Sequence, residues 1–335
     1  MRLKVNQEDH TFEDVAMTVA GFVARNELPV KSIVIALNGE IIPHSAWENV
    51  ELKDGDDVEI VRAVAGGDHD SLVIAGETFA SRLFLGTGKY PDIASMAESL
   101  AVSGTEMVTV AIRYMNLGDS GESSDSILDA IDLSKYRLLP NTAGAYTVAD
   151  AVKMARLARA ATGTNWIKLE VIGDQASLWP DVAGTIEATK QLVAEGFVVL
   201  PYTSPDLVAA IRLEEAGAAT VMPLASPIGS GQGMQDWISI QRIVNAVSVP
   251  VVVDAGIGVP SDAALAMEIG AAAVLVNTAV ARATQPAMMA EAMKLGVEAG
   301  RLAWRAGRIP RSVDAHPSSP TSGVPLEVGA GVRFE

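Results

Sequence analysis

The chain has 335 residues, 49% of them hydrophobic and 5% aromatic, which is enough apolar material for more than one folded core. Its formal net charge of −16 argues against nucleic acid as a partner, because phosphate backbones attract clusters of Lys and Arg. The chain has no cysteine, which excludes disulfides, cysteine nucleophiles and thiolate metal sites. Its four histidines are scattered outside any ligand-spaced motif, so we expect no metal.

The sequence also gives no sign of a membrane segment. It contains no uncharged apolar run of about 18 residues, the length that a spanning helix needs. Its start, MRLKVNQEDH, lacks the apolar core of a signal peptide. We therefore expect a cytoplasmic protein without a membrane partner.

The first 67 residues differ in pattern from the rest of the chain. Residues 14–28 place apolar side chains at helical spacing, and residues 32–42 contain Asn-Gly between two apolar runs, which indicates a hairpin. Short strands are expected at residues 2–6 and 58–64. Several strands around one helix in so short a span favour a β-grasp, or ubiquitin-like, fold.

This segment ends at Gly66-Gly67, which has two readings. A pair of glycines is commonly a flexible linker. After a β-grasp pattern, however, it can be the end of a carrier whose terminal glycine carboxylate is activated. Such a carrier holds sulfur as a thiocarboxylate, which suits a chain without a thiol.

From about residue 72 to 310, apolar strands alternate with amphipathic helices. Eight such strands fit a (β/α)₈ TIM barrel, with a doubly wound open sheet as the alternative. The segment 71–80 is expected to close the bottom of the barrel as a hairpin, and 311–335 to be a mostly disordered tail. The expected barrel strands are 82–88, 107–113, 137–143, 166–172, 197–203, 219–224, 250–256 and 273–279.

The fourth of these strands, WIKLEVI, alternates so that Lys168 and Glu170 share one face. Its apolar residues suit the helix-facing side, which leaves the lysine and the glutamate pointing into the barrel. Apolar walls would lower the pKa of Lys168 and free its amine to form a Schiff base with a carbonyl substrate. The alternative is a structural Lys–Glu ion pair.

The later strands end in residues that suit catalysis and phosphate binding. Asp254 ends the seventh strand, where it is either a general acid or base or a cap for the next turn. Barrels often bind phosphate after strands seven and eight. The candidates there are Ala255, Gly256, Asn277 and Thr278, with Gly229 in a second glycine-rich loop after strand six.

Together these residues closely resemble two families fused in one chain. Residues 1–67 resemble the ubiquitin-like sulfur carrier of thiazole synthesis, and residues from about 72 to 310 resemble thiazole synthase. The matching stretches are GTGKY (86–90), EMVTVAIR (106–113), LLPNTAGA (138–145), WIKLEVIGD (166–174), VMPLASPIGSGQG (221–233), VVDAGIG (252–258) and VLVNTAVA (274–281).

The resemblance implies roles for the candidate residues. Lys168 would form an imine with 1-deoxy-D-xylulose 5-phosphate, with Glu170 and Asp254 as the acid–base pair for isomerisation and dehydration. The same carry-over assigns the binding of this substrate and its phosphate to Gly229, Ala255, Gly256, Asn277 and Thr278.

The resemblance also implies partners. The carrier would be loaded at Gly66-Gly67 by an adenylating enzyme and a sulfur donor, and dehydroglycine would supply the remaining carbon and nitrogen. The enzyme would be a sulfur-incorporating transferase, a homodimer or homotetramer without a metal or organic cofactor. Its product would be the carboxylated thiazole phosphate.

Two positions depart from the family pattern. Gly67 is followed by Asp68, so the carboxylate that should accept sulfur lies in a peptide bond unless the chain is cut there. Tyr114 follows Arg113, where members of the family often carry a second arginine.

Two other hypotheses remain open from the sequence. A Schiff-base aldolase acting on a sugar phosphate would explain Lys168 and the glycine loops, but not the N-terminal segment. Alternatively, the N-terminal segment is only a ubiquitin-like module that docks pathway partners.

Overall fold

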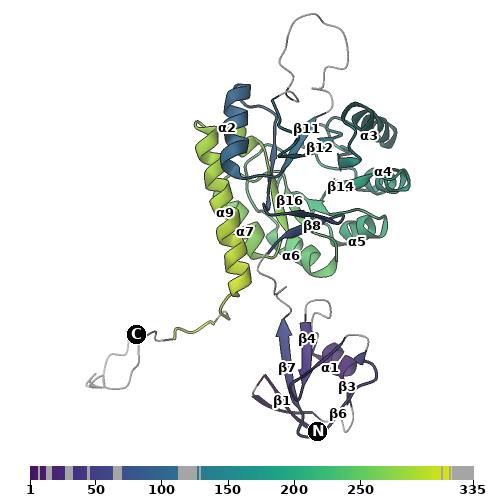
Figure 1. Ribbon diagram of the computed structural model, residues 1–335, viewed down its shortest axis with the longest axis vertical. Helices are drawn as coiled ribbons and strands as arrows, with labels where there is room; N and C mark the ends of the chain where they lie inside the picture. The colour runs from purple at the N-terminus through teal and green to yellow at the C-terminus, as the bar shows by residue number, and fades with distance from the viewer. Residues whose placement is uncertain are drawn as a thin grey trace, which may run out of the picture.

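The computed structural model describes residues 1–6, 8–12, 17–26, 33–43, 46–62, 70–111, 127, 130–310, 312–316 and 318. These residues form a small N-terminal domain and a larger barrel (Figure 1). No helix in the described part of the chain is long and apolar enough to cross a membrane. Gly66-Gly67, Arg113, Tyr114 and most of the expected tail lie outside the described residues.

The small domain is a mixed five-stranded sheet in the order β2-β1-β7-β4-β5. Strands β1 and β7, which lie near the two ends of the domain in sequence, are neighbours in the sheet and run parallel. Helix α1 (Val19–Arg25) buries Val19, Phe22 and Val23 in its core. This arrangement confirms the β-grasp prediction. The strands are β1 (Arg2–Val5), β2 (Glu8–Thr11), β4 (Ile33–Leu37), β5 (Glu40–Ile42) and β7 (Asp57–Arg62), with β3 (Met17–Thr18) paired to β6 (Glu51–Leu52).

Two local predictions for this domain need correction. The helix does not begin near residue 14, because Met17 and Thr18 pair with β6 and the Thr18 hydroxyl then caps α1 by accepting from Gly21 N. Strand β2 was not predicted, because its sequence EDHT has no apolar alternation. The Asn-Gly hairpin is confirmed, with Asn38 and Gly39 both at positive φ (54° and 84°) as a tight hairpin turn requires.

The larger unit is a barrel of eight parallel strands, as predicted. Its order, β15-β14-β13-β12-β11-β10-β17-β16, follows the chain around the ring. Parallel bridges from Val221 to Val251 and from Leu224 to Asp254 join the two outer strands and complete the ring. The strands are β10 (Leu83–Gly86), β11 (Met107–Ala111), β12 (Arg137–Asn141), β13 (Trp166–Leu169), β14 (Val198–Thr203), β15 (Met222–Pro223), β16 (Val252–Asp254) and β17 (Ala273–Val276).

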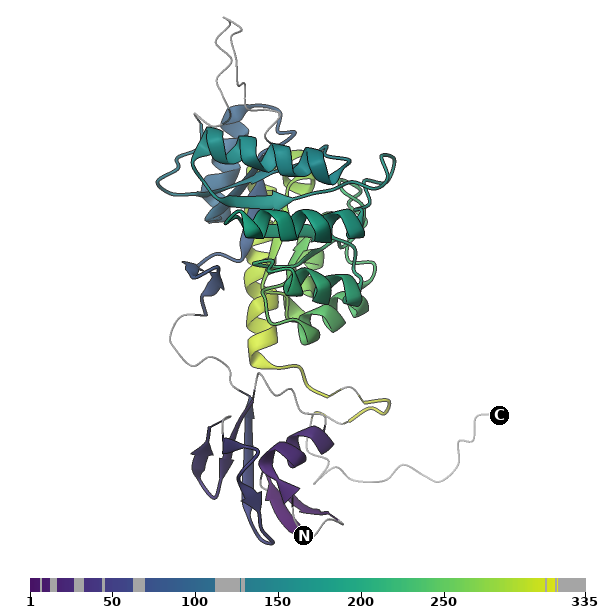
Figure 2. The same cartoon turned by 90° about the vertical axis from the view of Figure 1, so that its right-hand side faces the viewer.

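Helices surround the strands, and most begin at a side-chain cap. Asp92, Asp181, Asp206 and Asp236 each accept a hydrogen bond from a backbone N–H in the first turn of their helix. The helices are α2 (Ile93–Ser103), α3 (Val148–Thr162), α4 (Val182–Ala194), α5 (Leu207–Glu215), α6 (Trp237–Ala246), α7 (Pro260–Glu268), α8 (Thr278–Ala281) and α9 (Pro286–Ala306). The long helix α9 runs along one side of the barrel beside α2 and α7 (Figures 1 and 2).

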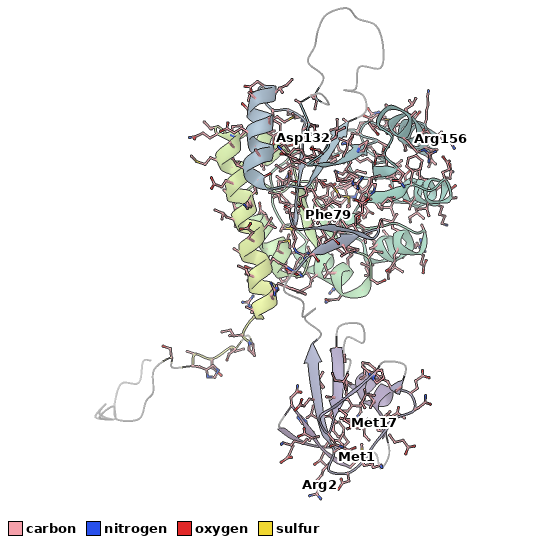
Figure 3. All side chains as sticks on the ribbon, in the orientation of Figure 1. Met1, Arg2, Met17, Phe79, Asp132 and Arg156 are labelled. Atoms are coloured by element: carbon pink, nitrogen blue, oxygen red, sulfur yellow. The ribbon has the colours of Figure 1, made fainter. Side chains whose placement is uncertain are left out.

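A hairpin closes the amino-terminal end of the barrel, as predicted. It consists of β8 (Leu72–Ile74) and β9 (Glu77–Phe79). Leu72, Ile74 and Phe79 pack against the first inward-facing residues of the strands. The Phe79 ring, labelled in Figure 3, meets Trp166 edge-to-face with 6.0 Å between centroids. The base of the barrel is therefore filled by an apolar plug.

An ion cluster fixes the chain just before this hairpin. Asp70 accepts from Arg82 Nη2 at 2.9 Å and from Arg301 Nε and Nη2 at 2.7 Å each. Arg82 also donates to Ala272 O at 2.7 Å. Since Arg82 and Ala272 directly precede β10 and β17, this cluster holds Asp70 at the amino-terminal end of the barrel.

Candidate active site

Lys168 and Glu170 lie at the carboxyl end of β13, and both line a cavity of about 650 Å³. Ile167, Leu169 and Val171 take the opposite face and pack with residues of α3 and α4. The alternation predicted from the sequence is therefore confirmed. Lys168 is only 6% exposed and Glu170 only 5%, so both ionisable groups are held away from bulk water.

Asp254, the last residue of β16, completes a buried group of three charges. Lys168 Nζ lies 2.5 Å from Asp254 Oδ2 and 3.5 Å from Glu170 Oε1. Burial alone would lower the pKa of Lys168, but the negative charges of Asp254 and Glu170 outweigh it and raise the pKa above its usual value. The prediction of a lowered pKa for Lys168 is wrong. The sequence indicated the apolar walls around the lysine, but it did not indicate the contact with Asp254.

Asp254 also orders the loop that follows it. Its Oδ1 accepts a hydrogen bond from Ala255 N at 2.8 Å, while Oδ2 faces the lysine. Ala255 has φ of +58°, a left-handed conformation that costs a residue other than glycine about 1–3 kcal/mol and is concentrated at functional sites. Asp254 therefore caps the turn through Oδ1, as one of its two predicted roles requires, while its other predicted role, as a general acid or base, stays a prediction.

A cluster of apolar and aromatic side chains borders the lysine on the side of β14. The fully buried Tyr202 ring lies 5.9 Å from Lys168 Nζ and packs with Ile172 and Leu224. Burial raises the pKa of Tyr202, and the charges of Asp254 and Glu170 raise it further. The phenol therefore stays neutral and keeps this wall of low polarity.

The glycine-rich loops after β15 and β16 lie backbone against backbone. Gly256 has φ of +72°, and a Cβ there would lie 1.9 Å from Ser226 Oγ. A Cβ on Gly258 would lie 2.5 Å from Gly231 O. Side chains at these positions would force the two loops apart, so the glycines permit their close approach.

The loop after β17 joins them at the same end of the cavity. A Cβ on Gly229 would lie 3.6 Å from Thr278 Oγ1, so the β15 loop reaches the start of α8. All five residues predicted for phosphate binding line the cavity that holds Lys168: Gly229, Ala255, Gly256, Asn277 and Thr278.

Asn277 has an additional contact that the sequence did not indicate. The neighbouring carbonyls assign its amide nitrogen to the side of β10, and in that orientation the nitrogen donates to Gly88 O at 2.8 Å and Gly86 O at 3.3 Å. A Cβ on Gly86 would lie 2.7 Å from the Asn277 Cβ, so glycine leaves room for this side chain. Asn277 thus ties the end of β17 to the end of β10 while forming part of the cavity wall.

Sequence reasoning missed two polar residues of the cavity wall, Asn141 and Thr109. Asn141, which pairs in register with Lys168, donates from Nδ2 to Thr109 Oγ1 at 3.2 Å, and both line the cavity. Asn141 ends its strand as Asp254 does, and that position was a signal for a residue of the site.

Two cations at the mouth of the cavity, Lys89 and Arg282, were also missed. Both side chains are exposed and line the opening. With Lys168 they give three positive charges against Glu170 and Asp254, a net of +1 among the charged residues lining the cavity, in a chain whose net charge is −16. The opening is therefore locally attractive to anions.

The site thus combines an amine, two carboxylates and glycine-rich backbone at the end of a barrel where substrates usually bind. The amine can attack a carbonyl, the carboxylates can move protons, and the backbone can approach an anionic oxygen closely. A cavity of this size accommodates a small phosphorylated metabolite together with a second reactant.

Comparison with known proteins assigns both parts of the chain. The family of thiazole biosynthesis protein ThiG matches residues 73–320, and the ThiS family matches residues 2–67. A thiazole synthase from Paramagnetospirillum magneticum is 47% identical over 326 residues, covering 97% of this chain and 100% of its own length. A thiazole synthase from Geobacter sp. is 54% identical over 256 residues, covering 76% of this chain and 98% of its own.

Among solved structures, a chain of the Amycolatopsis orientalis BexX/CysO complex superimposes with a TM-score of 0.66 and 36% identity. The match covers 72% of this chain and 98% of that one. The family match, the sequence identities and the structural match all point to the same family. This chain therefore belongs to the thiazole synthase family of thiamine biosynthesis, with a sulfur carrier domain of the ThiS family fused at its N-terminus.

Proposed function

We propose that this enzyme forms an imine between Lys168 and the ketone of 1-deoxy-D-xylulose 5-phosphate. The observation that carries the proposal is the buried amine between two carboxylates, 2.5 Å from Asp254 and 3.5 Å from Glu170. A lysine in this setting can be deprotonated locally although its pKa is raised, because a proton acceptor is in contact with it.

Asp254 takes the first proton in this scheme. It removes a proton from the Lys168 ammonium, and the free amine attacks the substrate carbonyl to form a C–N bond. The same proton returns to the carbinolamine hydroxyl, which leaves as water. Glu170, on the other side of the amine, then exchanges protons with the substrate carbons during isomerisation and dehydration.

The loops after β15, β16 and β17 hold the phosphate in this proposal. Gly229, Gly256 and Thr278 bring main-chain groups to one end of the cavity, the usual place for phosphate in a barrel. Lys89 and Arg282 at the mouth attract the dianion before it reaches the loops. The ketone then lies at Lys168, toward the centre of the barrel.

The reaction completed there is a sulfur-incorporating transfer. A carrier thiocarboxylate gives its sulfur to a carbonyl carbon of the bound sugar, and the oxygen of that carbonyl leaves with the carrier as its terminal carboxylate. The sulfur then bonds to the carbon of dehydroglycine, whose nitrogen displaces the amine of Lys168 and closes the ring. The product is the carboxylated thiazole phosphate. The ThiS family match of residues 2–67 supports a carrier as the source of the sulfur.

We further propose that the chain is cut after Gly67 before its own carrier domain works. Gly67 precedes Asp70 by three residues, a reach of at most about 11 Å. Asp70 is fixed at the amino-terminal end of the barrel by Arg82 and Arg301. The stretch from Arg82 to Thr87 alone spans roughly 16 Å toward the cavity, so Gly67 of an uncut chain cannot reach Lys168 of the same barrel.

Product formation by the purified chain tests the function. The protein is supplied with 1-deoxy-D-xylulose 5-phosphate, dehydroglycine and a separately prepared carrier thiocarboxylate, and the thiazole phosphate is followed by mass spectrometry. Product is expected from the unaltered chain and from Lys190→Ala, an exposed lysine of α4, but not from Lys168→Ala. Product from Lys168→Ala at the unaltered rate would contradict the proposal.

The same samples separate the alternatives. Cleavage of the sugar phosphate into two fragments without any carrier would indicate an aldolase instead. Intact mass of the protein from cells growing without added thiamine shows whether the carrier domain ends at Gly67. Finding only uncut protein in such cells would contradict cutting. Gly67→Ala should abolish sulfur loading, whereas a mere docking module would tolerate it.

A further inference from the structure

The two walls of the cavity beside Lys168 differ in polarity. On the side of β12 and β11, Asn141 and Thr109 line the cavity with an amide and a hydroxyl, which are hydrogen-bonded to each other at 3.2 Å. On the side of β14, the wall is formed by Ile172 and Leu178, which belong to one apolar cluster. A ligand carbon bonded to the lysine amine therefore lies between a polar wall and an apolar one.

Leu178 reaches the apolar wall in a strained backbone conformation. Its φ is +55°, a left-handed value that makes a bulky side chain a genuine outlier. The loop that holds it is closed by hydrogen bonds from Gly173 N to Trp179 O at 2.8 Å and from Ser177 N to Asp174 Oδ2 at 2.7 Å. Such outliers gather at functional sites, and this one places an apolar side chain on the cavity wall.

The apolar wall is poorly suited to a ligand hydroxyl. The cluster consists of Ile172, Leu178, Tyr202, Leu224, Ile228 and Ala255. Among these described residues, only Tyr202 carries a polar side-chain atom, and its hydroxyl donates to Leu178 O at 3.4 Å. A ligand hydroxyl placed against this wall would lose its hydrogen bonds to water without gaining a side-chain partner there, which is unfavourable.

The ketone proposed as the substrate has a matching asymmetry. The carbonyl carbon of 1-deoxy-D-xylulose 5-phosphate bears a methyl group on one side and a hydroxyl-bearing carbon on the other. When the methyl group lies against Leu178, the hydroxyl-bearing carbon faces Asn141 and Thr109. The reverse orientation would place a hydroxyl against the apolar wall and the methyl group against the polar one.

We propose that Leu178 and Ile172 form the subsite for this methyl group, and that Leu178 selects a 1-deoxy ketose phosphate over one with a hydroxyl at C1. This inference rests on the proposed imine at Lys168. An apolar pocket rejects an added hydroxyl by about 10²-fold. The unaltered chain should therefore prefer 1-deoxy-D-xylulose 5-phosphate over D-xylulose 5-phosphate by about that factor.

Competition between these two sugar phosphates for imine formation tests the proposal. The full-length chain is mixed with equal concentrations of both, borohydride is added, and the two reduced adducts, which differ by one oxygen, are compared at early times by intact mass. In Leu178→Asn the preference should fall from about 10²-fold to less than about tenfold, because the amide can pair with the added hydroxyl. Leu178→Met, which keeps the wall apolar, should retain the preference.

The variants are chosen so that a folding defect is recognised. Asparagine adopts positive φ more readily than leucine, so Leu178→Asn should fold, and circular dichroism checks this. The matched control is Val259→Asn, the same kind of change at an apolar residue of the cavity wall outside the cluster. It should leave the preference unchanged, because the two sugars differ only at C1.

The outcomes separate the subsite from the imine. Equal adducts from both sugars on the unaltered chain, or an undiminished preference in folded Leu178→Asn, would overturn the methyl subsite and leave the imine in place. Loss of both adducts in equal proportion in Leu178→Asn would also overturn it, because a merely structural residue would act in that way. No adduct from either sugar on the folded unaltered chain would overturn the imine, and the subsite with it.

Discussion

The two ends of the barrel are built from the same eight strands, but one end is packed with apolar side chains and the other opens into a cavity lined by polar ones. At the amino-terminal end, the strands present apolar residues to the hairpin plug around Phe79 and Trp166. At the carboxyl end, the same strands present Lys168, Asn141 and Asp254 to an open cavity. Apolar packing is therefore concentrated at one end and the proposed chemistry at the other, the division that barrel enzymes generally show.

Buried charge separates the two ends in another way. At the base, Asp70 is bound by two arginines, a cluster whose only evident effect is to fix the chain. Inside the cavity at the carboxyl end, one lysine faces two carboxylates, so the cluster carries an excess negative charge that can accept a proton. The comparison predicts that substitutions in the buried cluster around Lys168 reduce the rate of the reaction and that those at the base reduce stability.

Asp254→Asn should have the largest effect, on the rate of the reaction and on its pH dependence. Loss of the proton acceptor should lower product formation by about 10²–10⁴-fold, with little change in the denaturation midpoint. Because the negative charge of Asp254 raises the pKa of Lys168, its loss should also shift imine formation to lower pH. Single-turnover trapping between pH 6 and pH 10 measures both; an unchanged pH profile would show that Asp254 does not act on the lysine.

Among substitutions at the base of the barrel, Phe79→Ala should cause the largest loss of stability. Removing a fully packed aromatic ring from the plug should lower the free energy of unfolding by about 3–5 kcal/mol. Turnover per folded molecule should not change. Val73→Ala, an exposed residue of the same hairpin, is the control and should change stability by less than about 0.5 kcal/mol in urea denaturation.

Asp70→Asn should have a smaller, pH-dependent effect on stability. Its bond to Arg301, aided by the charges of Arg82 and Arg301, lowers the Asp70 pKa from 3.8 to about 2. The stabilisation from the carboxylate is therefore complete above about pH 4 and is lost as the pH falls toward 2. At pH 7 the variant should lose about 1.5–3 kcal/mol.

Urea denaturation of the two proteins from pH 7 down to pH 2 checks this sign. The difference in unfolding free energy should shrink toward acid. A difference that grows as the pH falls would mean that the cluster acts by some route other than the charge of Asp70.

Arg282→Gln should have the smallest effect, on substrate binding at the mouth. Removing one exposed cation should raise KM for the phosphorylated substrate by about three- to tenfold and leave kcat unchanged, a loss of up to about 1.4 kcal/mol. Added salt should diminish the difference. Arg242→Gln, an exposed arginine of α6 outside the cavity lining, should not alter KM.

The architecture was predictable because its signals are local and repeated. Parallel strands buried on both faces give continuous apolar runs, and eight such runs separated by helical segments fit one closed sheet. The side on which Lys168 and Glu170 lie followed from alternation within β13 alone. The hairpin plug followed from its alternating pattern and its place before β10.

The features that could not be predicted from the sequence depend on contacts between segments that are distant along the chain. The raised pKa of Lys168 requires Asp254, which comes from a strand three further along the chain. The fixed position of Asp70 requires Arg301 of the last helix. The contact of Asn277 with Gly86 and Gly88 requires closure of β17 against β10. Local periodicity carries no information on any of these.

The central claim is that Lys168 is the amine that binds the sugar ketone, and borohydride trapping tests it most directly. The full-length chain is incubated with 1-deoxy-D-xylulose 5-phosphate and borohydride, and its intact mass is measured. We expect one reduced substrate adduct per chain, located at Lys168 by peptide mapping, retained in Lys190→Ala and absent in Lys168→Ala. An adduct that persists in folded Lys168→Ala, or none in the folded unaltered chain, would contradict the imine and leave Lys168 as a structural member of the charge cluster.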